Sequence, residues 1–394
     1  MFLLVTLSTV LAQGADPANT ASPIDLALRP PAIVLDPGAA YGDAARAWQG
    51  IPGIERAANG RLWATWYSGG PTEGMWNYVV VYTSGDDGVT WSPVLVVDPP
   101  GDVRAFDPCL WIDPLGRLWT FWAQGYGGDA NPAKVESVWD GRAGVWAITT
   151  DTPGEAAPSW SPPRRLCNGI MMNKPTVTSS GAWLLPASVW RLPPNPLHPH
   201  RLPEESAANV VGSRDQGGSW TRYGGAYVAS AAFDEHMVVE RADGSLWMLV
   251  RTSQGIGESV STDGGRTWIA GDPATFGSLP SARFFLRRLA SGKLLLVRHN
   301  PPNRKSRSHL TAFLSADDGA TWTGGLMLDE RNGVSYPDGV EADDGRIYVA
   351  YDYDRYGVRE IYMTVFTEAD VIAGAYQSPK ARERVLINQA TETP

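Results

Sequence analysis

The chain has 394 residues, of which 43% are hydrophobic and 19% are charged, a composition typical of a globular protein. Its formal net charge of −9 leaves no basic surplus to neutralise phosphates, which argues against a nucleic-acid partner. The 42 Gly, 31 Pro and 17 Trp favour many short strands joined by turns over long helices.

The first residues have the character of a secretion signal. Residues 2–12 are apolar and too short to span a bilayer, and Val10 and Ala12 frame a plausible cleavage site, although no Lys or Arg precedes them. We expect a signal peptide over residues 1–15, an N-terminal arm over 16–40, and a secreted or periplasmic protein without a membrane span.

Cysteine and histidine are sparse. Cys109 and Cys167 are either free thiols or a disulfide, which an exported protein would permit. Of the five histidines only His198 and His200 lie close together, with proline between them and no further ligand in register. We therefore expect no metal site and no cofactor.

Six copies of a glycine turn, each followed by an apolar strand, run through the chain. The turn glycines recur at intervals of 48 to 65 residues. Asp-Gly or Asn-Gly between apolar runs predicts a β-hairpin, whose two turn residues should both have φ > 0. The six segments are Asn59–Trp63, Leu115–Trp119, Ser180–Leu184, Asp243–Trp247, Ser291–Leu295 and Asp344–Tyr348.

A second repeat has the form Ser-x-Asp-x-Gly-x-Thr/Ser-Trp. Its Asp can accept hydrogen bonds from the backbone of its own turn while the Trp packs against the hairpin, so each copy predicts a self-contained turn. Four copies begin at Ser84, Ser213, Ser261 and Ser315, and residues 150–160 form a fifth with an insertion.

These two repeats predict an all-β fold, a six-bladed β-propeller with four-stranded antiparallel blades over residues 41–378. An α/β barrel would need helical periodicity between the strands, which is absent outside residues 367–371 and the tail over 379–394. The Ser-x-Asp turns should join the third and fourth strands, on the face opposite the functional site.

The inner strands of a propeller all begin at one face of its central channel. Charged groups directed at this axis must pair with one another, as a structural plug, or bind a ligand, and we favour a ligand. The residues nine positions before each turn glycine should converge there: Ile51, Asp107, Met172 (with Asn173 and Lys174 beside it), Glu235, Arg283 and Tyr336.

The loops after the second strands open on the same face and are rich in arginine. Convergent guanidinium groups indicate a bound carboxylate, sulfate or phosphate. The phenol of Tyr336, with an ordinary pKa near 10, needs a base such as Glu235 to act as a nucleophile. A tyrosine suits a substrate that is already anionic at its reacting carbon, because a carboxylate would be repelled. The loop arginines are Arg191, Arg251, Arg298, Arg304, Arg307 and Arg355.

Together these features resemble the sialidase (neuraminidase) superfamily, whose six-bladed propellers carry bacterial neuraminidase repeats. The resemblance covers roughly residues 45–365. It implies that Tyr336 is the nucleophile and that Glu235 polarises it. Glu73 would be the general acid/base, and Arg251 and Arg307 would hold a substrate carboxylate.

The sequence departs from the family pattern at the first inner strand. Sialidases begin this strand with Arg-Ile-Pro, whose Arg completes a carboxylate-binding triad, but residues 50–52 here are Gly-Ile-Pro. Losing one charge-assisted pair costs on the order of 1.5–3 kcal/mol. We expect Arg283 to compensate, and Asp107, His236 and Asp338 to complete the substrate-binding set.

We therefore expect a glycoside hydrolase: a retaining exo-glycosidase that removes a terminal sialic acid or related acidic sugar through a Tyr nucleophile. Two alternatives stay open. One is a hydrolase or lyase of another acidic polysaccharide, in which Tyr336, His236 and an arginine act on a uronate. The other is a non-catalytic carbohydrate-binding propeller. In each case the partner is an acidic glycan or glycoconjugate.

Overall fold

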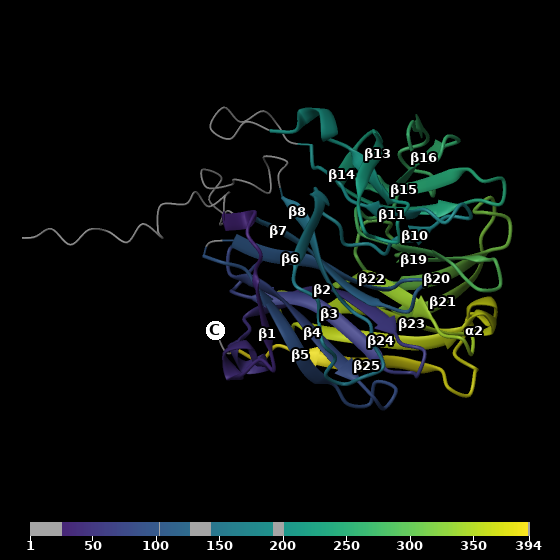
Figure 1. Ribbon diagram of the computed structural model, residues 1–394. Helices are drawn as coiled ribbons and strands as arrows, with labels where there is room; N and C mark the ends of the chain where they lie inside the picture. The colour runs from purple at the N-terminus through teal and green to yellow at the C-terminus, as the bar shows by residue number, and fades with distance from the viewer. Residues whose placement is uncertain (1–25, 102, 127–142, 192–200, 393–394) are drawn as a thin grey trace, which may run out of the picture.

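The computed structural model describes residues 26–101, 103–126, 143–191 and 201–392, and these form a six-bladed β-propeller, as predicted (Figure 1). Each blade is an antiparallel sheet of four strands, except that the first has five. The strand β2 packs beside β22 and so closes the ring between the first and last blades. The predicted signal peptide, His198 and His200 lie outside the described residues.

The strands follow one another through the blades in chain order. Blade 1 contains β1 (Ala32–Leu35), β2 (Trp48–Arg56), β3 (Leu62–Gly69), β4 (Asn77–Ser84) and β5 (Ser92–Asp98). Blade 2 contains β6 (Val103–Ile112), β7 (Leu118–Tyr126), β8 (Gly144–Thr150) and β9 (Arg164–Asn168). Blade 3 contains β10 (Thr176–Val177), β11 (Trp183–Pro186), β12 (Ala208–Ser213) and β13 (Thr221–Ala226).

The remaining blades repeat this order from the inner to the outer strand. Blade 4 contains β14 (Ala231–Glu240), β15 (Leu246–Thr252), β16 (Gly255–Ser261) and β17 (Ile269–Ala270). Blade 5 contains β18 (Phe285–Arg288), β19 (Leu294–His299), β20 (Leu310–Ser315) and β21 (Thr323–Asp329). Blade 6 contains β22 (Val334–Glu341), β23 (Arg346–Tyr353), β24 (Glu360–Thr367) and β25 (Arg382–Gln389).

Both ends of the described chain contribute strands that lie outside the propeller range predicted from the sequence. Within the predicted N-terminal arm, β1 pairs with β5, placing Ala32 opposite Asp98. Within the predicted tail, β25 forms the outer strand of blade 6, placing Gln389 opposite Glu360. The propeller therefore extends beyond residues 41–378 on both sides.

Helices are short and few in the described residues. The α-helix α2 (Glu368–Ala373) begins at Thr367, whose side chain accepts a hydrogen bond from the backbone N–H of Asp370. It lies in the stretch that the sequence identified as helical. Three 3-10 helices are η2 (Ala39–Tyr41), η3 (Asp43–Ala45) and η5 (Pro203–Glu205).

The six glycine turns have one common geometry, which differs in type from the prediction. In blade 1, Gly60 has φ of 96°, whereas Asn59 does not have positive φ. The N–H of Gly60 donates to the Ala57 carbonyl at 2.8 Å, and the Ala57 N–H donates to the Arg61 carbonyl at 2.8 Å. The same pair of bonds recurs in the other five blades. The turns are confirmed, but they are three-residue loops with a glycine bulge, so only the glycine needs positive φ.

The Ser-x-Asp repeats join the third and fourth strands, as predicted. In blade 1, one carboxylate oxygen of Asp86 accepts from the Thr90 N–H at 2.9 Å and the other from the Thr90 hydroxyl at 2.6 Å. The Ser84 hydroxyl accepts from the Gly88 N–H at 2.8 Å. These bonds hold the pKa of Asp86 below its usual range. Each repeat is therefore a structural turn.

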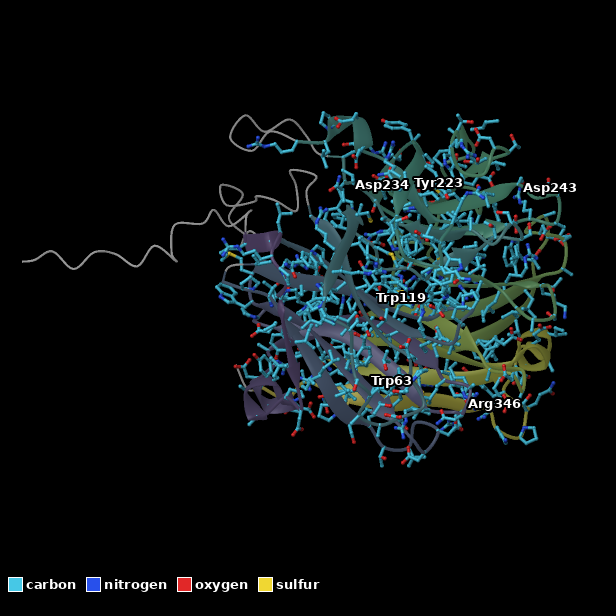
Figure 2. All side chains as sticks on the ribbon, in the orientation of Figure 1. Trp63, Trp119, Tyr223, Asp234, Asp243 and Arg346 are labelled. Carbon is cyan, nitrogen blue, oxygen red and sulfur yellow. The ribbon has the colours of Figure 1, made fainter. Side chains whose placement is uncertain are left out.

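Both kinds of turn lie at one face of the propeller. The backbone N–H of Ala242, in the glycine turn of blade 4, donates to Asp318 in the Ser-x-Asp turn of blade 5. Arg346, beside the glycine turn of blade 6, pairs with Asp87 of blade 1 at 2.8 Å. Figure 2 shows Asp243 and Arg346, from the turns of blades 4 and 6, on the side of the molecule that carries α2. The inner strands begin at the opposite face.

Two further predictions concern the cysteines and a membrane span. Cys109 and Cys167 are free thiols, which selects one of the two alternatives left by the sequence. Burial raises the pKa of each thiol to about 12. Within the described ranges, no helix is long and apolar enough to cross a membrane.

A buried ion cluster ties the blades together at the propeller axis. The Nζ of Lys174, which precedes β10, donates to the carbonyls of Ile54 at 2.7 Å and Leu110 at 2.6 Å. It also lies 3.1 Å from Glu55 and 3.3 Å from Asp338. Burial lowers the pKa of Lys174, but Asp338 and Glu55 outweigh this effect and raise it above its ordinary value. One ammonium group thus links blades 1, 2, 3 and 6.

Arg283 extends the cluster to blade 5. Its Nε donates to the Asn173 side chain at 2.6 Å, and its Nη2 donates to the Met172 carbonyl at 2.8 Å. The same Nη2 lies 3.5 Å from Asp338. Asn173 in turn donates to the carbonyl of His236 in blade 4 at 2.7 Å. The cluster therefore contacts all six blades.

Substitution of Lys174 by Met should destabilise the protein by about 3–5 kcal/mol, because it leaves Glu55 buried without a cation and removes one of the two cations of Asp338. The measurement is urea unfolding followed by tryptophan fluorescence. Lys293→Met is the matched control, since Lys293 pairs with Glu368 at the surface with 34% of its side chain exposed. That variant should lose no more than about 1 kcal/mol. Equal small losses in both variants would contradict the structural role of the cluster.

Candidate active site

The inner strands of blades 1, 2 and 6 are irregular at the positions that the sequence singles out. Ile51, Asp107 and Tyr336 have φ values of 60°, 48° and 54°, in the left-handed region that side chains rarely adopt. The pairing register shifts at each of these points. A bulge of this kind redirects a side chain, and such strain, about 1–3 kcal/mol per residue, is concentrated at functional sites.

Tyr336, Glu235 and Arg251 form the centre of the candidate site. The phenol oxygen of Tyr336 lies 3.4 Å from Glu235 Oε1, and Arg251 Nη1 lies 2.7 Å from the same carboxylate oxygen. Arg251 Nη1 is also 3.4 Å from the phenol oxygen. The sequence-based pairing of Tyr336 with Glu235 agrees with this geometry, although they are 101 residues apart.

The phenol of Tyr336 is protonated at neutral pH in this arrangement. Burial and the neighbouring Glu235 raise its pKa to about 12, although Arg251, Arg355 and Arg307 act in the opposite direction. A phenol in this state must lose its proton as it attacks. Glu235 is within reach to accept it, and catalytic hydrogen bonds are often long before substrate binds.

Arg307 is a second cation beside the phenol, and it is held by neutral groups. Its guanidinium donates to the Ser335 hydroxyl at 3.2 Å and to the Ser281 carbonyl at 2.8 Å. The Ser281 hydroxyl accepts from Arg251 Nε at 3.2 Å, so one serine, which the sequence did not indicate, orients both arginines. No carboxylate lies within 4 Å of Arg307 in the described part of the chain, which leaves its charge available for an anion.

Glu73 lies on the loop after β3, where the sequence placed the general acid/base. Its Oε2 accepts from the hydroxyl of Tyr67 at 3.0 Å, and its Oε1 accepts from the hydroxyl of Tyr356 at 3.2 Å. Arg355 Nη1 lies 3.3 Å from Oε1. With 34% of its side chain exposed, Glu73 is the most accessible acid of the site.

Arg355 occupies the space beside Gly50. A Cβ atom added to Gly50 would lie 2.2 Å from Arg355 Cδ and 2.8 Å from Cγ. The guanidinium carbon lies 4.7 Å from the centroid of the Tyr336 ring. The sequence placed Arg355 among the loop arginines, but nothing in its spacing indicated that its side chain turns toward Gly50.

Asp107 faces the same group of charges from blade 2. Burial raises its pKa to about 8, Arg104 opposes this, and Glu235 and Glu73 raise it further. The carboxyl group is therefore protonated at neutral pH and can donate a hydrogen bond. This state agrees with a role in contacting a neutral group of a ligand, because it adds no negative charge to the site.

The structure gives three of the predicted substrate contacts partners within the protein. Both ring nitrogens of His236 lie 2.8 Å from backbone carbonyls, those of Asp234 in blade 4 and Asn209 in blade 3, so this buried ring links two neighbouring blades. Arg283 and Asp338 are 1% and 0% exposed and belong to the axial ion cluster. The polar ring predicted from the sequence is thus divided into two groups. The side chains of one group pair with one another in the axial ion cluster, and those of the other group, which includes Tyr336 and Glu235, form the candidate site.

The arrangement can hold an anion beside a phenol that has a general base. Guanidinium groups from blades 4, 5 and 6 surround Tyr336, at the channel face opposite the structural turns. No group of three or more His, Cys, Asp or Glu side chains in the described ranges is placed to hold a metal ion.

Comparison with known proteins places the chain in a family. The model of the BNR repeat-like domain matches residues 43–349. Among curated proteins, no sequence matches the chain. Solved structures with a similar fold include the Hadza microbial sialidase Hz136, at 20% identity and a TM-score of 0.62, over 84% of this chain and 68% of that one.

Two further structures match over nearly their whole length. The intramolecular trans-sialidase from Ruminococcus gnavus is 16% identical, with a TM-score of 0.62, over 86% of this chain and 98% of that one. A protein of unknown function from Dyadobacter fermentans is 18% identical, with a TM-score of 0.59 and the same coverage. Identities this low show a shared fold alone. The chain belongs to the family of BNR repeat-like domains, with the six-bladed propeller fold of sialidases and trans-sialidases.

Proposed function

We propose that the protein is a retaining exo-glycosidase that hydrolyses a terminal sialic acid or a related acidic sugar. The observation that carries this proposal is the contact between the Tyr336 phenol and Glu235, at 3.4 Å, inside a group of arginines. A nucleophile with its base accounts for bond cleavage, and the arginines account for an anionic substrate.

Arg251 and Arg307 would bind the carboxylate of the sugar. Their shared contact with Ser281 fixes both guanidinium groups before substrate arrives, which lowers the entropy lost on binding. A carboxylate bound by them would hold the anomeric carbon near Tyr336. Protonated Asp107 would donate a hydrogen bond to a hydroxyl or amide oxygen of the ring.

The reaction would proceed in two displacements. Glu73 would donate a proton to the leaving oxygen as Tyr336 attacks the anomeric carbon and transfers its phenolic proton to Glu235. The glycosidic bond breaks, and the sugar is bound to the tyrosine oxygen. Glu73 would then accept a proton from water as that water displaces the tyrosine, while Glu235 returns its proton to the phenol oxygen, with net retention at the anomeric carbon.

The alternative of a lyase loses its main support. It requires an imidazole beside the substrate, but His236 is buried with both nitrogens against backbone carbonyls. The names of the similar structures, a sialidase and a trans-sialidase, agree with a glycan substrate. Export directed by residues 1–15 remains part of the proposal, and it would place the enzyme where such glycans occur.

Substitution of Tyr336 by Phe should lower turnover on the order of 10³-fold or more while affinity for an acidic sugar changes little. The measurement is release of a fluorogenic aglycone from a panel of sialic, deaminated sialic, shorter ulosonic and uronic acid glycosides. Tyr223→Phe, on the outer strand β13, is the matched control and should retain activity. If the wild type binds a panel sugar but releases no aglycone from any glycoside, the protein is a binding propeller.

The raised pKa of Asp107 predicts a pH-dependent stability. The folded state keeps a proton on Asp107 up to about pH 8, whereas the unfolded chain releases it near the ordinary value of 3.8. Stability should therefore fall as pH rises through this window, by at most about 1.4 kcal/mol per pH unit. Asp107→Asn should remove this contribution, so it should gain stability over the wild type as pH increases.

Urea unfolding at pH 5, 7 and 9 measures this difference. Asp151→Asn, at an exposed position, should follow the wild type at all three values. The assignment of a protonated Asp107 fails if Asp107→Asn follows it as well.

A further inference from the structure

We propose that Arg355, from the loop after β23 in blade 6, is an anion-binding residue of the site and replaces the arginine that Gly50 lacks. The inference rests on the proposed function, because it assigns the residue a contact with the substrate carboxylate. It starts from the contact between Gly50 and the stem of Arg355.

The space beside Gly50 accommodates only one side chain. A Cβ atom at position 50 would lie 2.2 Å from Arg355 Cδ and 3.0 Å from a carboxylate oxygen of Asp352. Gly50 does not have positive φ, so its backbone conformation does not itself require glycine. Glycine at position 50 is therefore explained by the presence of the Arg355 side chain.

Two carboxylates orient the guanidinium group. Arg355 Nε lies 3.6 Å from Asp352, and Nη1 lies 3.3 Å from Glu73. Asp352 is itself fixed, because its Oδ2 accepts from the backbone N–H of Ile51 at 2.8 Å. The Nη2 group makes no hydrogen bond to a described residue, and 12% of the side chain is exposed. An anion can therefore bind Nη2 without displacing either carboxylate.

Arg355 converges with the other two arginines on the phenol. Its guanidinium carbon lies 4.7 Å from the Tyr336 ring centroid, and that of Arg307 lies 5.7 Å away. Arg251 Nη1 is 3.4 Å from the phenol oxygen. Three guanidinium groups beside one tyrosine match a planar carboxylate on the reacting carbon better than a neutral sugar. The ligand class is thus a sugar acid whose carboxylate is next to the scissile bond.

The test compares binding of a sugar acid with binding of its ester. The probe is the 2,3-dehydro derivative of sialic acid, which has no glycosidic bond to cleave, together with its methyl ester and inorganic sulfate. Arg355→Met keeps the stem that packs on Gly50 and removes the charge. Calorimetric affinity for the acid should fall about 10- to 100-fold, while affinity for the ester stays within about twofold.

A second experiment places an arginine at position 50. Gly50→Arg alone should weaken binding of the acid, because its side chain collides with Arg355. The double variant Gly50→Arg/Arg355→Ala should bind the acid more tightly than Arg355→Ala does, since the new guanidinium enters the vacated space. Unfolding curves of all variants check that each is folded.

The outcomes separate the two proposals. Unchanged affinity for the acid in Arg355→Met, or equal losses for acid and ester, would overturn the role of Arg355 and leave the proposed function intact. If the double variant binds the acid no more tightly than Arg355→Ala does, then side chains at positions 50 and 355 do not occupy the same space. Sulfate binding that falls with that of the acid supports a general anion contact. A wild-type protein that binds none of the probes overturns the proposed function.

Discussion

The buried ion cluster at the axis is the interaction on which the rest of the structure depends. Lys174 and Arg283 carry two positive charges, and Glu55 and Asp338 carry two negative ones. Removing four charges from water is costly, and only a closed ring that brings them together offsets that cost. Because Asp338 is two residues from Tyr336, the same cluster fixes the strand that carries the candidate nucleophile.

Near this cluster, bulges in three inner strands break the regular repeat of the blades and position the side chains of the candidate site. The bulges at Ile51, Asp107 and Tyr336 place left-handed residues in three inner strands. Each left-handed residue lowers the stability of the fold, and the packing of six blades offsets this loss. The bulges also change which side chains point along the channel, so that Asp338 joins the cluster while Tyr336 reaches Glu235.

The charges of the candidate site are balanced toward an anionic ligand. Glu235 is paired with Arg251, and both Glu73 and Asp352 are paired with Arg355. Arg307 has only neutral partners, and the raised pKa of Asp107 keeps its carboxyl group uncharged near pH 7. An incoming carboxylate would therefore meet the guanidinium group of Arg307, which has no carboxylate partner among the described residues, beside a phenol. This balance unites the proposed nucleophile, its base and the anion-binding role of Arg355.

The sequence by itself determined the six blades, the places of both kinds of turn and the ring positions of Asp107, Glu235 and Tyr336. These features depend on hydrogen bonds between near neighbours and on a regular repeat, which a short segment encodes. Tertiary structure decided which polar side chains pair with each other and which face a ligand. Arg283 and Arg355 are both arginines near the axis, yet Arg283 meets Asp338 and Arg355 fills the space at Gly50. Their partners lie far away in sequence, and ring closure brings them together.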